Sequence, residues 1–111
     1  MTEGLQSRLV MGDDALFELL ASEVSLGIGS QDPRYRRALG RAWFESHLVQ
    51  LRSIICGHPS VAQFVSLPTD TAALASAMAD LLAVALSAPA VYTVAVLASR
   101  YGIARICGTE Q

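Results

Sequence analysis

The sequence predicts an all-α fold, a compact bundle of five or six helices that ends in an Ala/Leu-rich helical hairpin. Apolar residues recur at helical spacing along most of the chain, and Pro and Gly signals divide the chain into segments of helix length. The β-branched run from Val91 to Val96 has no second strand-like segment with which to pair. A chain of 111 residues is the size of one domain, so we assign residues 1–111 to a single helical domain.

The first half of the chain contains the best-marked helix. Residues 2–11 form a short helical segment with Thr2 as its cap, and Asp13 and Asp14 cap a second helix that ends near Leu26. The third helix begins at Asp32-Pro33, because Asp is a strong N-cap and Pro suits the first helical position. It continues without interruption to Cys56, where Gly57 supplies a left-handed stop.

The second half predicts three more helices. Ser60 to Gln63 fits a capping box that opens a short helix before Pro68, and Thr69 or Asp70 then caps an Ala-rich helix that runs to Leu86. Residues 87–89 break this helix, and the last one extends from about Pro89 to Cys107, with Gly108 as its stop. The apolar stripes of all these helices predict a core that includes Leu19, Leu20, Trp43, Leu48, Leu51, Ile55, Phe64, Leu82 and Leu97.

An uncharged run from Leu81 to Ser99 allows two interpretations. Its 19 residues approach the length that spans a bilayer, so a small membrane-inserting or pore-forming protein using residues 71–107 is the alternative to a bundle. Pro89 lies in the middle of the run, however, and much of the run is Ala, which is only weakly hydrophobic. A buried helical hairpin therefore explains the run better.

Composition and cysteine content exclude several classes of function. The chain is 52% apolar and 16% charged with a net charge of −2, so it is not a disordered tail and has no basic field for nucleic acid. With only Cys56 and Cys107, and no secretory signal at its start, we expect reduced thiols and a cytoplasmic location. A thiolate at Cys56 would lie at a helix C-terminus, where the helix dipole disfavours it.

We therefore predict that the protein is not an enzyme and binds no cofactor. A zinc site would need Cys56, Cys107, His47 and His58, but no Cys-x-x-Cys spacing supports one. The repeated Ile-Cys-Gly at residues 55–57 and 106–108 is interpreted as two helix ends, each with a small buried thiol.

The only concentrated charge is a group of four arginines at the start of the third helix: Arg34, Arg36, Arg37 and Arg41. Their planar guanidinium groups suit interfaces with carboxylates. We expect them to form the polar part of a protein interface, with Asp13, Asp14 and Glu18 of a second copy as the counterpart in a head-to-tail contact. If the same acids pair with these arginines inside one chain, the arginine group is structural instead.

The layout of residues 32–108 supports a functional class. Trp43-Phe44 on an Arg-rich helix, an Ile-Cys-Gly stop, and an Ala/Leu hairpin that ends in Arg-Tyr-Gly-Ile-Ala-Arg-Ile-Cys resemble the small helical effector-associated domains of bacterial defence systems. This resemblance to death-fold-like adaptor modules implies homotypic contact between domains and identifies no functional residue. We expect a non-enzymatic protein–protein interaction module, an adaptor or self-associating domain, whose partner is another protein or a second copy. A membrane partner is the less favoured possibility.

Overall fold

The computed structural model describes residues 2–24, 32–59, 71–86 and 90–107. These residues form an all-α fold, as predicted, and contain no strand. The helices are α1 (Thr2–Leu9), α2 (Asp13–Glu23), α3 (Pro33–Ser46), α4 (Leu48–Ile55), α6 (Thr71–Leu82), α7 (Ala90–Tyr101) and α8 (Ile103–Cys107).

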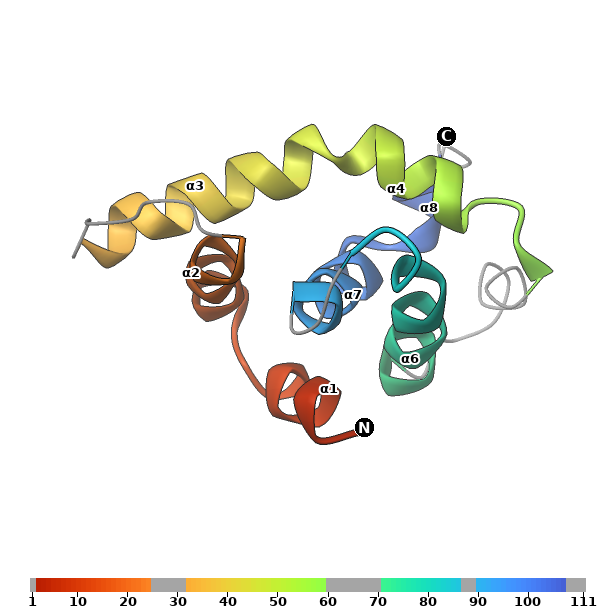
Figure 1. Ribbon diagram of the computed structural model, residues 1–111, viewed down its shortest axis with the longest axis horizontal. Helices are drawn as coiled ribbons and strands as arrows, with labels where there is room; N and C mark the ends of the chain where they lie inside the picture. The colour runs from red at the N-terminus through yellow and green to blue at the C-terminus, as the bar shows by residue number, and fades with distance from the viewer. Residues whose placement is uncertain (1, 25–31, 60–70, 87–89, 108–111) are drawn as a thin grey trace.

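Helix α7 is the centre of the fold. It contacts α1, α2, α6 and α8, while α3 and α4 run along one side of the molecule (Figure 1). Every residue of α7 from Ala90 to Ala98 is buried except Tyr92. The uncharged run of the sequence is therefore covered, in its α7 part, by other helices of the same chain.

The C-terminal hairpin is confirmed, with a first helix that ends earlier than predicted. Helix α6 ends at Leu82 rather than at Leu86, residues 83–86 form turns, and α7 begins at Ala90. Within the described parts of the chain, no helix combines the length and the apolar character needed to cross a membrane.

The third predicted helix begins where expected but divides in two. The Asp32 carboxylate accepts a hydrogen bond from the backbone N–H of Arg34 at 2.9 Å, and Pro33 occupies the first turn. The prediction of one helix to Cys56 is wrong, because α3 ends at Ser46 and α4 begins at Leu48. His47, between them, donates from its ring Nδ1 to the carbonyl of Trp43 at 2.7 Å and stacks on the Trp43 ring. The backbone N–H of His47 also bonds the carbonyls of Trp43, at 3.2 Å, and Phe44, at 3.1 Å, a shared donor of the kind common at helix ends.

Other helix ends also differ from the sequence prediction. Gly12, not Asp13 or Asp14, is the N-cap of α2, and the two aspartates occupy the first turn; α2 then ends at Glu23, before the predicted Leu26. The predicted last helix divides at Gly102, whose φ of +104° is readily adopted only by glycine.

The left-handed stop at Gly57 is confirmed by its φ of +82°. Three further predictions lie outside the described residues: the helix after Ser60, the cap at Thr69 or Asp70, and the stop at Gly108.

The core contains five of the predicted residues, Leu20, Leu51, Ile55, Leu82 and Leu97. Three predictions are wrong, since Leu19, Trp43 and Leu48 are only half-buried. On α2 the buried positions are 16, 17, 20 and 21, a face that excludes Leu19. Trp43 and Leu48 lie before and after the break at His47 and are partly buried hydrophobic residues packed against the core. Phe64 lies outside the described residues.

Helices α2 and α3 approach so closely that only glycine fits at one position. A β-carbon on Gly40 would lie 1.9 Å from the carbonyl oxygen of Phe17, a backbone atom that cannot move aside independently. This close approach fixes the distance between α2 and α3, and with it the distances between the charged side chains that the two helices carry.

The expectation of reduced thiols is wrong. Cys56 at the end of α4 and Cys107 at the end of α8 form a disulfide, with their Cα atoms 5.7 Å apart. The same two helices are also joined by a hydrogen bond of 2.7 Å from Arg52 Nε to the carbonyl of Ile106. Each cysteine follows a buried isoleucine, Ile55 or Ile106, so burial of these two side chains brings the following residues together. In this state neither cysteine is a free thiol for nucleophilic chemistry or zinc ligation.

Candidate functional site

The structure brings part of the predicted arginine interface together within one chain. Arg37 on α3 lies 3.0 Å from Glu18 and 3.7 Å from Asp14, both on α2, measured between guanidinium nitrogens and carboxylate oxygens. Arg41 approaches Asp14 at 4.0 Å. These intrachain pairs give Arg37, Asp14 and Glu18 a structural role between α2 and α3. The predicted head-to-tail contact stays a prediction, but it no longer has the support of unpaired charges at these three residues.

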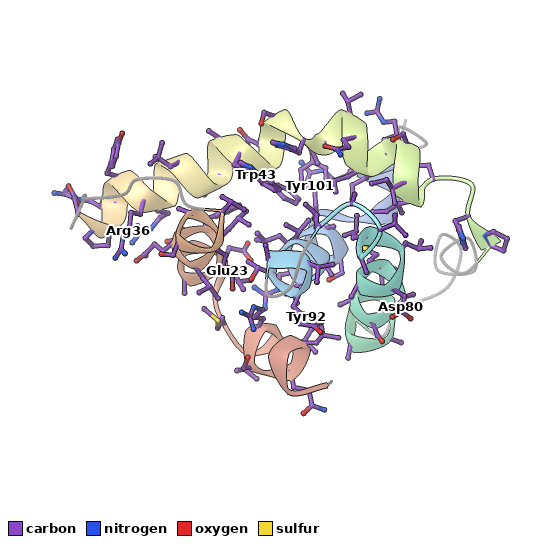
Figure 2. All side chains as sticks on the ribbon, viewed as in Figure 1. Glu23, Arg36, Trp43, Asp80, Tyr92 and Tyr101 are labelled. Carbon is purple, nitrogen blue, oxygen red and sulfur yellow. A yellow bond between two sulfur atoms is a disulfide. The ribbon has the colours of Figure 1, made fainter. Side chains whose placement is uncertain are left out.

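The other predicted interface residues lie apart from these pairs. The Arg34 side chain is 85% exposed, and its Nε lies 3.7 Å from the carboxylate of Asp32, which is the N-cap of the same helix. Arg36 is half-buried, and its Nε is buried with no hydrogen-bond partner in the described part of the chain (Figure 2). Asp13 pairs with Arg100 at the end of α7, at 2.8 Å. The predicted set therefore does not form one continuous surface.

Two adjoining hollows lie where α2, α3 and the α7–α8 corner meet. Their volumes are about 140 and 220 Å³, and both are lined by Asp13, Phe17, Phe44, Tyr101 and Arg105. Leu97 and Arg100 complete the smaller hollow, and Arg41 and Glu45 complete the larger one. We refer to the two together as the aromatic hollow. Arg41 and Asp13 belong to the set predicted from the sequence, whereas the other lining residues do not.

A row of three aromatic rings lines the aromatic hollow. Phe44 contacts Phe17 and Tyr101 edge to face, with ring centroids 6.2 and 6.0 Å away. An arginine closes each end of this row: Arg41 lies over the Phe17 ring at 5.1 Å, and Arg105 lies over the Tyr101 ring at 4.1 Å. In the view of Figure 2, Tyr101 lies between α7 and the α3–α4 side of the molecule. The row therefore joins an apolar surface to two cations.

The three arginines of the aromatic hollow differ in how far their charges are already neutralised. Arg100 is engaged by Asp13 at 2.8 Å and by the carbonyl of Leu9 at 2.9 Å. Arg41 has a carboxylate only at 4.0 Å, and Arg105 has no ion pair within the described residues. A guanidinium that lies over a ring can still donate its N–H groups to an acceptor beside the ring. Arg41 and Arg105 are therefore the groups able to bind an added anion.

The turn at Gly102 positions one wall of the aromatic hollow. Its positive φ ends α7 after Tyr101 and starts α8, so that Tyr101, Arg100 and Arg105 lie around one corner. The signal in the sequence is Arg-Tyr-Gly-Ile-Ala-Arg at residues 100–105, two arginines and an aromatic residue around a glycine stop. Phe17 and Phe44 carried no separate signal, because a buried aromatic residue on an apolar stripe is typical of any helical core.

A second polar cluster lies inside the bundle, between α1, α2 and α7. Arg8 Nε donates to the Thr93 hydroxyl at 2.7 Å, the Thr93 hydroxyl donates to Glu23 at 2.6 Å, and the Arg8 guanidinium forms an ion pair with Glu23. The side chains of Arg8 and Glu23 are only 11% and 6% exposed, and Thr93 is fully buried. Glu23 lies between α2 and α7 in Figure 2. This buried triad satisfies its own polar groups and joins three helices, which is a structural role.

Comparison with known proteins adds no assignment: no protein-family model, curated protein or solved structure matches this chain. Among the described residues, no group of three or more His, Cys, Asp and Glu side chains is arranged to hold a metal ion.

Proposed function

We propose that this chain is a non-enzymatic protein–protein interaction module, and that the aromatic hollow is the surface where the partner binds. The observation that carries the proposal is the aromatic row Phe17–Phe44–Tyr101 with a stacked arginine at each end. Aromatic and arginine side chains are the types enriched where proteins bind one another tightly.

The chemistry of the aromatic hollow supports binding rather than catalysis. The guanidinium groups of Arg41 and Arg105 supply positive charge and hydrogen-bond donors, which suits them to bind an anion. The other ionisable groups that line the hollow are Asp13 and Arg100, which pair with each other, the Tyr101 hydroxyl and the exposed Glu45. Fixed cations beside apolar rings give a partner both charge recognition and apolar contact, which matches the adaptor role implied by the resemblance of residues 32–108.

The cytoplasmic location expected from the sequence remains a prediction, and the disulfide removes one of its arguments. Disulfides persist mainly in oxidising compartments. The redox state of Cys56 and Cys107 in cells that make the protein therefore reports the compartment in which the module works.

Site-specific photo-crosslinking in those cells tests the proposed function. A photoreactive diazirine amino acid replaces either Glu45, at the edge of the aromatic hollow, or Asp80, an exposed acidic residue on α6 (Figure 2). We expect a discrete protein adduct from position 45 and none from position 80, because only the first lies at the proposed surface. The adduct's mass separates a second copy from a different protein. If position 45 gives no adduct, or gives the same adducts as position 80, the proposal is contradicted.

A further inference from the structure

We infer that the aromatic hollow binds an acidic peptide segment of the partner, one that presents a single aromatic side chain flanked by carboxylates. This inference rests on the proposed function and specifies the chemistry of the partner. It follows from charge, shape and the competing groups at the site.

The charge at the site favours an acidic ligand. Two guanidinium groups, Arg41 and Arg105, flank the larger hollow, and within the described residues their only ion-pair partner is Asp14, at 4.0 Å from Arg41. Each is held in place by an aromatic ring beneath it, at 5.1 and 4.1 Å. Because these side chains are already oriented, a carboxylate binds them with less loss of side-chain entropy than it would bind free surface arginines. Carboxylates on both sides of one apolar group match these two cations, of which Arg105 lines both hollows and Arg41 lines the larger one.

The size of the site favours one ring. A cavity of about 150 Å³ is enough to hold benzene, and the smaller hollow, at about 140 Å³, is close to that volume. Its walls include Phe17, Phe44 and Leu97, which are at most 9% exposed and so form a firm apolar lining. A partner's phenylalanine ring would meet Phe44 and Tyr101, and aromatic pairs of this kind prefer edge-to-face or offset contact.

Of the two carboxylates that line the site, Asp13 is paired with Arg100, so Glu45 is the main competing group. It lines the larger hollow, it is exposed, and it is four residues from Arg41 on the same helix. A carboxylate there repels an acidic ligand and competes for Arg41. Removing its charge should therefore strengthen binding, an effect opposite in sign to the removal of either arginine.

The test is an NMR titration of the full chain with a five-residue peptide that has a central phenylalanine and two glutamates on each side. We expect shifts concentrated at the backbone amides of Tyr101, Arg105 and Phe44. Arg105→Gln and Arg41→Gln should each weaken binding about tenfold, as loss of one exposed charge-assisted contact predicts, and Glu45→Gln should tighten it. Arg34→Gln, which removes an equal charge from an arginine that is 85% exposed and does not line the hollow, serves as the matched control and should leave the affinity unchanged.

Two comparison ligands define the chemistry. The same peptide with glutamine in place of glutamate should bind at least about tenfold more weakly, and phenylacetate, which has the ring and one carboxylate without a peptide, should bind more weakly than the acidic peptide. The inference is overturned if the acidic peptide does not bind, or if Arg105→Gln binds it as tightly as the wild type does. It is also overturned if either comparison ligand binds the wild type as tightly as the acidic peptide does. In each of these cases a position-45 crosslink that persists leaves the proposed function standing, whereas loss of the crosslink removes both.

Discussion

Replacing Glu23 with alanine is expected to lower the free energy of unfolding by about 3 to 5 kcal/mol, the range for breaking a buried ion pair. The Arg8 side chain is only 11% exposed, and the change leaves its guanidinium without a carboxylate. It also removes the acceptor of the Thr93 hydroxyl. An unpaired buried charge is costly because neither water nor a counter-ion solvates it. Chemical denaturation followed by circular dichroism measures the loss.

Two further variants separate the buried triad from ordinary charge effects. Asp14→Asn removes a carboxylate that is 62% exposed, and should cost less than about 1 kcal/mol. The triple variant Arg8→Met, Glu23→Met, Thr93→Val makes the whole triad apolar, and should be more stable than Glu23→Ala alone, because no buried polar group of the triad is left unpaired. If Glu23→Ala costs no more than Asp14→Asn, the triad does not hold α1, α2 and α7 together.

Loss of the Cys56–Cys107 disulfide is the second large effect that we expect. The two cysteines are separated by 51 residues, and closing a loop of that length restricts the unfolded chain by about 4 kcal/mol on the chain-entropy account. Cys56→Ser, Cys107→Ser and the double variant remove the same bond, so all three should lose about the same stability, in guanidinium unfolding without reductant. The losses should not add.

Reduction of the wild-type protein provides the control for this prediction. With a strong reductant present, its unfolding curve should move to that of the double serine variant, whose own curve should not respond to reductant. Reductant could instead leave the wild-type stability unchanged and equal to that of the serine variants. That result would show that α4 and α8 are held together by packing and the Arg52–Ile106 hydrogen bond alone.

Local chemistry made several helix ends predictable. Asp32, Pro33 and Gly57 act on the backbone within two residues of themselves, so their effect can be inferred without knowing the fold. The break at His47 could not be inferred in this way, because the apolar stripe continues across it from Phe44 to Leu48. It depends on the histidine ring bonding the Trp43 carbonyl, which is one of several conformations that a histidine can adopt.

Tertiary placement explains why the candidate site was only partly predicted. The aromatic hollow combines residues 13–17, 41–45 and 97–105, three segments that meet only once α2, α3 and α7 are packed. The pairing of Arg37 with Glu18 likewise depends on the close contact at Gly40 between α2 and α3. The two Ile-Cys-Gly segments did carry a signal for the disulfide, since each puts a cysteine directly after a core isoleucine, but sequence separation alone does not show that the two helix ends meet.

The crosslink from position 45, measured in two charge variants, tests most directly whether the partner binds at the aromatic hollow or at the arginine face predicted from the sequence. Arg105→Gln removes a cation of the hollow, and Arg37→Gln removes the arginine that pairs with Asp14 and Glu18. At equal amounts of folded protein, we expect the adduct to be largely lost in Arg105→Gln and retained in Arg37→Gln. An adduct that is lost in Arg37→Gln and retained in Arg105→Gln would contradict the hollow as the binding surface.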